Sequence, residues 1–365
     1  MCVTASHAAG YRAALVADMD TGMVLYSENA NELNYPASLT KIMTLYLTFN
    51  ALEHGRLHLD DYLIVSQSAA NAAPVKLGLA AGSKIKVEDA IKAVAVYSAN
   101  DVARVLAENL KGGKEGNFAS LMTDVAAQIG LTRTNFENSS GLPNDDHMST
   151  ARDIALLSMA VYKHFPQYWK YFGIKTWTYN GKTYTNGNRL LGTYPGCDGM
   201  KTGFTNKSKY SLVATAARNN HHLMSVVLGA ETKDIRASVS TKMLDRGFAM
   251  LGDSNGVTAT VVNNTPTAPI VTAPAKSVSN TSTPKSTTTT TFASGNAGLQ
   301  CGAFSSRGVA MEQVARVMHF LNVTPTIEPN GTGMFRVRIN GLSDSAAADL
   351  KSRASANGID CFVFH

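Results

Sequence analysis

Several features that mark other protein classes are missing from this chain of 365 residues. No run of 18 apolar residues occurs, so we expect no transmembrane helix. His147 lies in a polar loop, and no second histidine has the spacing of a metal ligand with it. His221 and His222 are adjacent at the start of a predicted strand. We therefore expect no metal site and no cofactor, and we interpret His147 as a solvated or capping loop residue.

Cysteine is also scarce, with four residues in the chain. Cys301 and Cys361 lie in the first and last strands predicted for the C-terminal segment, and a disulfide between them fits an oxidising compartment. Cys197 is expected to be a lone thiol. Cys2 lies in a short segment, 1–10, that contains no complete signal peptide but resembles the small-residue end of one. We interpret this segment as a signal-peptide remnant and expect an exported, periplasmic protein.

Charged residues make up 16% of the chain, with a formal net charge of +6 and a pI near 9.0. A basic protein is attracted to anionic surfaces, so we expect peripheral association with a cell wall or with lipid head groups. The hydrophobic content of 44% leaves room for a sizeable core and for more than one domain.

Composition changes sharply near residue 259. From 259 to 296 the chain is mostly Thr, Ser, Pro, Ala and Asn, and only Lys276 and Lys285 are charged. Such a segment cannot bury a core, so we predict a disordered linker. It would separate a large domain, 11–258, from a small one, 297–365.

The first of three widely spaced motifs holds Ser38 and Lys41. Both lie in a predicted helix, 36–55, which is apolar on nearly every side and should therefore be buried. Residues three apart share a helix face. Burial and the positive end of the helix dipole both favour a neutral lysine, which can take a proton from a serine. The alternative is a lysine that reaches solvent beside an ordinary serine.

The second motif, Ser98 and Asn100, lies in a predicted turn between two apolar helices. There a hydroxyl can pass a proton to a leaving amine, and an amide can hold Lys41 or a substrate carbonyl. Serine and asparagine also favour turns for purely structural reasons.

The third motif, Lys201, Thr202 and Gly203, precedes two predicted antiparallel strands, 210–216 and 222–229. The lysine would supply positive charge near a substrate, and the glycine lets a ligand approach the strand closely. Each motif alone is weak evidence. The ordered trio indicates acyl transfer through a serine ester.

With these motifs in this order, residues 11–250 resemble the penicillin-binding D-alanyl-D-alanine carboxypeptidases, serine peptidases of bacterial cell-wall metabolism. Segments 20–25, 140–143, 149–153 and 198–203 also resemble that family. The resemblance implies an α+β, β-lactamase/transpeptidase-like fold, in which helices flank an antiparallel sheet and a helical subdomain is added. It also implies peptidoglycan peptide stems as substrate and β-lactams as inhibitors.

The resemblance assigns a role to each catalytic residue. Ser38 would be the nucleophile, and Lys41 would be the base that activates it. Ser98 would relay a proton to the departing D-alanine, while Asn100 would position the substrate amide.

Carried over in the same way, Lys201 and Thr202 would hold the terminal carboxylate region of the peptide, and Arg236 would bind the carboxylate. The backbone N–H groups of Ser38 and Phe204 would form the oxyanion hole. Some relatives have histidine where this chain has Phe204, so we expect a change in substrate preference and no loss of activity.

The C-terminal segment has a predicted βαββαβ order. The strands are expected at 299–304, 325–327, 334–339 and 359–364, and the helices at 308–321 and 344–357. This pattern resembles the SPOR domain, a peptidoglycan-binding module that recognises glycan strands stripped of peptides, commonly at division sites. The resemblance implies enrichment of the protein at the septum.

Because side chains alternate along strands, Gln300, Arg336 and Arg338 are our candidates for glycan binding; the alternative is that they are ordinary solvent-exposed strand residues. An RNA-binding module has a similar topology. The segment lacks that family's paired stacking aromatics, and its basic residues exceed its acidic ones by only one, so we expect no nucleic-acid partner.

The sequence thus predicts a periplasmic serine D-Ala-D-Ala carboxypeptidase linked to a glycan-binding module. A D,D-endopeptidase that cuts cross-links with the same residues and an inactive wall-binding scaffold remain as alternatives. A β-lactamase is disfavoured, because no Glu-x-x-x-Asn-type deacylation block occurs in a fitting place after Ser98.

Overall fold

The computed structural model describes residues 10–252, 295–304, 310, 313, 314, 317, 321, 323, 325–329, 334–356 and 359–365. The expected signal-peptide remnant and linker lie outside the described residues, apart from their last residues, as does most of the expected helix 308–321. Among the described residues, none of the helices combines the length and the hydropathy that a membrane crossing requires.

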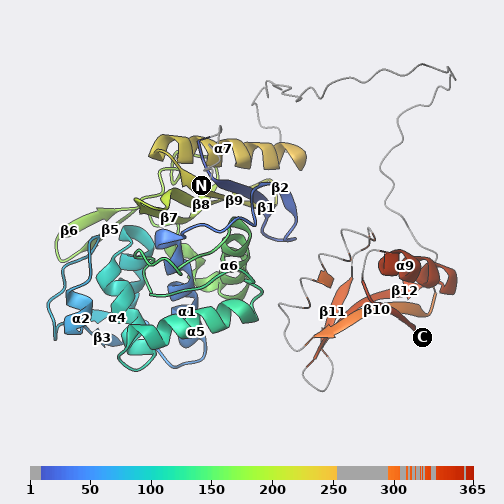
Figure 1. The fold of residues 1–365 in the computed structure, drawn as a ribbon, viewed down its shortest axis with the longest axis horizontal. Helices are drawn as coiled ribbons and strands as arrows, with labels where there is room; N and C mark the ends of the chain where they lie inside the picture. Colours follow the sequence, from blue (N-terminus) through green and yellow to red (C-terminus); the bar gives the residue numbers. More distant parts are fainter. Residues whose placement is uncertain are drawn as a thin grey trace, which may run out of the picture.

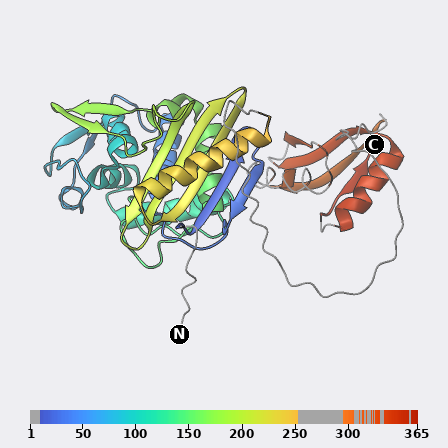
Figure 2. The same cartoon turned by 90° about the horizontal axis from the view of Figure 1, so that it is seen from above.

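The large unit is built around a five-stranded antiparallel sheet with the order β2-β1-β9-β8-β7. Its strands are β1 (Ala13–Asp18), β2 (Val24–Glu28), β7 (Cys197–Thr205), β8 (Lys209–Arg218) and β9 (His221–Ala230). The helix α7 (Lys233–Met250) crosses one face of the sheet, and α6 (Ala151–His164) packs on the other (Figures 1 and 2). β7 forms one edge of the sheet, and η1 (Ala37–Thr40) packs against it.

Helices and short hairpins form a second layer, which packs through η1 and α6 against the sheet (Figure 1). These elements are η1 (Ala37–Thr40), α1 (Lys41–Glu53), β3 (Tyr62–Ile64), α2 (Gln67–Ala70), β4 (Lys84–Lys86), α3 (Val87–Lys92), η2 (Ala93–Tyr97), α4 (Asn100–Leu110), α5 (Glu115–Gln128), η3 (Pro166–Tyr171), β5 (Thr176–Tyr179) and β6 (Lys182–Thr185). Sheet, flanking helices and helical subdomain confirm the expected fold class.

The predicted helix 36–55 is confirmed as two consecutive pieces, a 3-10 turn (η1) followed by α1. Every residue of α1 is buried except Asn50 and Glu53, as an all-round apolar sequence predicts. The tighter first turn precedes Lys41, so the motif serine lies just before the α-helix proper.

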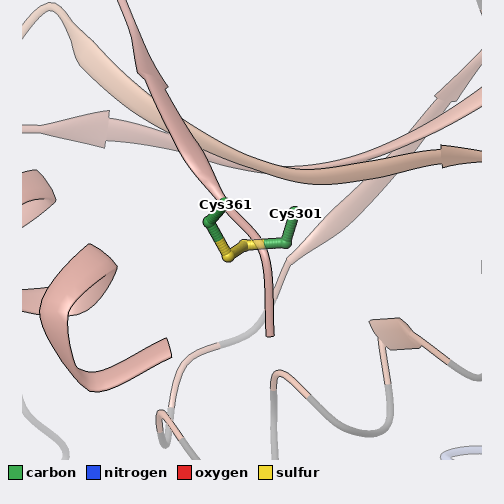
Figure 3. Close-up of a disulfide and its surroundings, with 2 residues drawn as sticks. All are labelled: Cys301 and Cys361. Carbon is green, nitrogen blue, oxygen red and sulfur yellow. A yellow bond between two sulfur atoms is a disulfide. The ribbon is translucent and has the colours of Figure 1, made fainter. Parts of the chain in front are cut away.

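The small unit has a four-stranded antiparallel sheet with the order β11-β12-β10-β13. Its strands are β10 (Ala297–Phe304), β11 (Thr326–Pro329), β12 (Phe335–Leu342) and β13 (Phe362–Phe364), and α9 (Asp344–Ala356) packs on one face. The first and last strands pair as predicted. Cys301 and Cys361 form a disulfide, with 4.1 Å between their Cα atoms, which confirms the expected pairing (Figure 3).

Candidate active site

Ser38 lies where the turn η1 packs against the edge strand β7. A Cβ atom at Gly203 would stand 3.0 Å from the carbonyl oxygen of Pro36 and 3.3 Å from the backbone nitrogen of Ser38. Only glycine leaves room for this approach without a shift of the neighbouring backbone. The serine N–H and the β7 backbone are therefore neighbours, which is the arrangement that an oxyanion hole formed by Ser38 and Phe204 requires.

Lys41 is fully buried beside Ser38, and its Nζ atom lies within hydrogen-bond distance of three oxygens. These are Ser38 Oγ at 2.9 Å, Asn100 Oδ1 at 2.7 Å and the Ser140 carbonyl oxygen at 2.6 Å. Burial lowers the pKa of Lys41 well below its ordinary value, nearby Lys201 lowers it further, and Glu115 opposes this. A neutral amine in this position can accept the proton of the Ser38 hydroxyl.

Ser98 occupies a sharp corner between η2 and α4. Its φ of 67° is in the left-handed region, which costs a residue with a side chain about 1–2 kcal/mol. Its Oγ atom is buried and has no hydrogen-bond partner among the described residues. A buried hydroxyl without a partner lacks a bond that a bound substrate could supply.

Lys201 and Arg236 form a pair of buried cations, 2% and 4% exposed. Lys201 donates to the Thr202 carbonyl oxygen at 3.1 Å, and Arg236 donates to the carbonyl oxygens of Ser211 at 3.5 Å and Gly187 at 3.3 Å. Within the described part of the chain, neither cation has a carboxylate partner. Two such cations are suited to bind an anion such as a peptide carboxylate.

Burial and neighbouring cations lower the pKa values of both groups. Burial, with a smaller contribution from Arg236, lowers the pKa of Lys201 to about 7. Burial and then Arg189 lower the pKa of Arg236 to about 10. Lys201 therefore titrates in the physiological range.

This gives a pH prediction. In the free protein, Lys201 is charged below about pH 7 and loses its charge as the pH rises. We expect kcat/KM for a carboxylate-terminated peptide to fall above about pH 7, approaching tenfold per pH unit. A matched peptide that ends in a carboxamide should lack this fall. Equal profiles for the two peptides would contradict a carboxylate-binding role for Lys201.

Phe204 follows the third motif and is 48% exposed. Its ring stacks on Tyr210 with 4.3 Å between ring centroids. The ring is thus held in place at the edge of the candidate site, where it can contact a substrate. An influence of Phe204 on substrate preference stays a prediction.

Of the two interpretations of His147, a solvated or a capping loop residue, the solvated one is wrong. Its side chain is buried, its Nε2 lies 2.8 Å from Thr40 Oγ1, and its Nδ1 accepts from the Glu137 backbone N–H at 3.3 Å. Burial, with Lys41 nearby, lowers its pKa to about 4, so it is neutral at pH 7. The polar sequence of the loop suggested exposure to solvent, but the loop folds back against η1 and buries the His147 side chain. Among the described residues there is no cluster of three or more possible metal ligands.

Sequence reasoning also missed the loop that supplies the third oxygen to Lys41. Asn138 Oδ1 accepts from the backbone N–H groups of Ser140, Gly141 and Leu142, at 2.7–3.2 Å. Glu115 accepts from the neighbouring Ser139 N–H and hydroxyl and pairs with Arg104 at 2.7 Å. The only sequence signal was the family-like pattern at 140–143, which did not indicate a contact with Lys41.

Among the described residues of the small unit, α9 packs on one face of the sheet, and Gln300 and Arg338 lie on the opposite face. Arg338 donates to Gln300 at 3.0 Å and to Glu328 at 3.2 Å, and its guanidinium lies 4.3 Å from the Phe364 ring centroid. Gln300 faces Arg338 across the β10–β12 pair, so the two candidates are brought together, although Gln300 is only 6% exposed. Arg336 lies two residues along β12, partly exposed.

Two aromatic residues on this face were not predicted. Phe362 and Phe364 are opposite Gln300 and Gly298 in the register of β10 and β13. A Cβ atom at Gly298 would stand 2.3 Å from the Phe364 ring, so the glycine lets the ring lie over the strand. Phe362 and Phe364 are two residues apart in a predicted strand, and this spacing could have indicated that both rings lie on one face. The face combines two arginines, a carboxylate, an amide and two rings.

Comparisons with known proteins agree with this geometry. Residues 3–232 match the Peptidase_S11 family model, described as D-alanyl-D-alanine carboxypeptidase, and residues 293–364 match the SPOR domain model. The chain is 36% identical over 243 residues to D-alanyl-D-alanine carboxypeptidase DacF of Bacillus subtilis, which covers 65% of this chain and 62% of that protein. It is 40% identical over 244 residues to DacC of Escherichia coli, with 65% and 61% covered.

Solved structures of similar fold are also penicillin-binding proteins. Penicillin binding protein 5 from Haemophilus influenzae superposes with a TM-score of 0.64 at 34% identity, covering 68% of this chain and 73% of that one. Penicillin-binding protein D2 from Listeria monocytogenes, in its ampicillin-bound form, has a TM-score of 0.61 at 31% identity, with 67% and 99% covered. The chain spans about three fifths of the length of the curated relatives it matches. It belongs to the D-alanyl-D-alanine carboxypeptidase family of serine peptidases and carries a C-terminal SPOR domain.

Proposed function

We propose that this protein is a serine-type D-Ala-D-Ala carboxypeptidase that removes the terminal D-alanine from peptidoglycan pentapeptides. The observation that carries the proposal is the contact of the buried, low-pKa amine of Lys41 with both Ser38 Oγ and Asn100 Oδ1. This contact brings the first two motifs together in one site. Strand β7, which carries the third motif, lies beside Ser38.

In the proposed reaction, Lys41 takes the hydroxyl proton as Ser38 Oγ attacks the carbonyl carbon of the penultimate D-alanine. The oxyanion is bound by the backbone N–H groups of Ser38 and Phe204, each worth about 3 kcal/mol in such sites. Ser98 passes a proton to the departing amine, and water then hydrolyses the ester.

The substrate is held at its terminal carboxylate and at its amide. Lys201, Thr202 and Arg236 bind the carboxylate, because both cations are buried and Arg236 is near enough to Lys201 to lower its pKa. Asn100 positions both Lys41 and the substrate amide. The same constellation would be acylated by β-lactams, since a relative of similar structure is known in ampicillin-bound form.

Mass spectrometry of muropeptides tests the proposal. Pentapeptide-bearing and cross-linked muropeptides are incubated with the wild-type protein and with Ser38→Ala. Loss of one terminal alanine with the wild type alone is expected. Cleaved cross-links with intact pentapeptides would establish the D,D-endopeptidase, and no change in either substrate would favour an inactive wall-binding scaffold.

We further propose that the SPOR domain binds peptide-free glycan strands through the sheet face opposite α9 and enriches the protein at the division septum in the periplasm. Gln300, Arg336 and Arg338 are the polar candidates, and Phe362 and Phe364 add surfaces on which sugar rings can stack. Deleting 297–365 should abolish septal enrichment and leave activity on soluble peptides unchanged. Unchanged localisation would refute the targeting role.

A single substitution tests the face itself. Arg338→Ala removes the cation that contacts Gln300, Glu328 and the Phe364 ring, and we expect glycan affinity to fall about tenfold or more. Lys351→Ala, on the exposed side of α9, removes the same charge away from the face and is the control. Equal binding by both variants to isolated peptide-free glycans would place the binding surface elsewhere.

A further inference from the structure

A stretch without regular secondary structure, Ala73–Leu79, runs beside the candidate site between α2 and β4, and we call it the rim segment. Its residues are exposed or half-buried, and two of them, Leu77 and Leu79, pack against the hydrophobic core. Two consecutive residues at the start of α4, Asn100 and Asp101, provide polar anchors along its length.

Asp101 anchors the distal half of the rim segment. Its side chain is fully buried, and its carboxylate accepts from the backbone N–H groups of Leu77 at 3.1 Å, Gly78 at 2.9 Å and Leu79 at 3.4 Å. No cation pairs with Asp101 within the part of the chain that the structure describes. The backbone N–H groups of the rim segment thus satisfy a buried carboxylate, and hydrogen bonds to an ionised group are the stronger kind.

Asn100 anchors the proximal half. Its backbone N–H donates to the Val75 carbonyl oxygen at 2.7 Å, and its side-chain Nδ2 donates to the carbonyl oxygens of Ala73 and Pro74, each at 3.0 Å. Carbonyl oxygens can only accept, so they require the NH₂ end of the amide. The Oδ1 end is therefore turned toward Lys41 Nζ, 2.7 Å away.

We propose that Asp101 is a positioning residue for the reaction: it fixes the rim segment, whose carbonyls fix the orientation of the Asn100 amide that holds Lys41. The inference rests on the proposed function and assigns a role to a residue outside the three motifs. If the rim segment loosens, Nδ2 loses both acceptors, the amide can rotate, and water reaches Lys41.

The test compares Asp101→Ala and Asp101→Asn with the wild type. We expect the second-order rate of acylation by a fluorescent penicillin to fall about tenfold in Asp101→Ala, with partial rescue in Asp101→Asn, which retains one acceptor oxygen. Because water would restore solvation to the Lys41 amine, its pKa should rise. The acid limb of the acylation pH profile should therefore move to higher pH.

Limited trypsin digestion reports on the rim segment without reference to activity. Cleavage after Lys76 should be faster in Asp101→Ala than in the wild type. Glu108→Gln is the matched control. Glu108 is a buried acid on the same helix, and its carboxylate accepts from the Ser66 hydroxyl and not from the rim segment. It should lower thermal stability without moving the pH profile or the cleavage after Lys76.

The outcomes separate the inference from the proposed function. Asp101→Ala with the same pH profile and the same protection at Lys76 as Glu108→Gln would overturn the positioning role. Faster cleavage with an unshifted pH profile would also overturn it, because the rim segment would then be anchored without affecting Lys41. A wild-type protein that no penicillin labels would overturn the proposed function, whatever trypsin shows.

Discussion

Ser38→Ala is expected to abolish covalent labelling by penicillin and to reduce D-alanine release to background. Loss of a serine nucleophile from a comparable site lowers kcat by about a millionfold, because no other group can form the acyl intermediate. Lys41 keeps its contacts with Asn100 and Ser140 in the variant, so the fold should persist. Intact-protein mass spectrometry after incubation with penicillin measures the result.

Ser120→Ala is the control, since Ser120 is an exposed serine on α5 whose hydroxyl donates only to a carbonyl oxygen within its own helix. It should label like the wild type. A penicilloyl adduct on Ser38→Ala, with the mass shift mapped to another serine, would assign the nucleophile elsewhere. The assignment of Lys41 as base would then fail with it.

Gly141→Ala is expected to have the largest effect on stability. Gly141 has a φ of 80°, and a Cβ atom there would stand 1.7 Å from the Ala37 carbonyl oxygen. The left-handed conformation and the clash together should lower the free energy of unfolding by about 3 kcal/mol or more. For a unit of this size that corresponds to a fall in Tm of about 10 °C.

Activity should fall in the same variant. Gly141 directly follows Ser140, whose carbonyl oxygen binds Lys41, and it contacts η1, which carries Ser38. To relieve the clash, either η1 or the loop that contains Ser140 must move. Acylation kinetics well below the unfolding temperature separate this local effect from global instability.

Gly82→Ala is the matched control for Gly141→Ala. Gly82 has a nearly equal φ of 77°, but a Cβ atom there would have no neighbour within 4 Å, so only the backbone strain of about 1–2 kcal/mol applies. Thermal denaturation of the two variants compares strain alone with strain plus clash. Equal losses would show that the contact between Gly141 and η1 can relax freely.

Local patterns were sufficient for most elements of the fold. The helix around Ser38 was predictable because its apolar residues and its terminal proline and glycine are all local signals. The β8–β9 pair and the strands of the small unit followed from alternation, and the Cys301–Cys361 disulfide followed from the order of those strands. His147 was misread because nothing local distinguishes a polar loop in solvent from one folded onto a buried turn.

Of the contacts of Lys41, some were predictable from the sequence and others were not. The contact with Ser38 was predictable, because three residues along a helix bring side chains together. The contacts with Asn100 and Ser140 join residues 59 and 99 positions apart. Of these, the motif order suggested Asn100, while the Ser140 carbonyl carried no side-chain signal at all.

Residue type and short spacing were enough to identify which residues could perform serine chemistry and in which elements they lie. The apolar helix already favoured a buried, neutral Lys41, but the lowered pKa of Lys201 came from the folded chain, because distant segments bury it and bring Arg236 near. The folded chain also set the anchoring of the rim segment by Asp101 and the stacking of Phe364 on Arg338. Contacts between residues far apart in the sequence depend on the whole tertiary structure, and no local pattern encodes them.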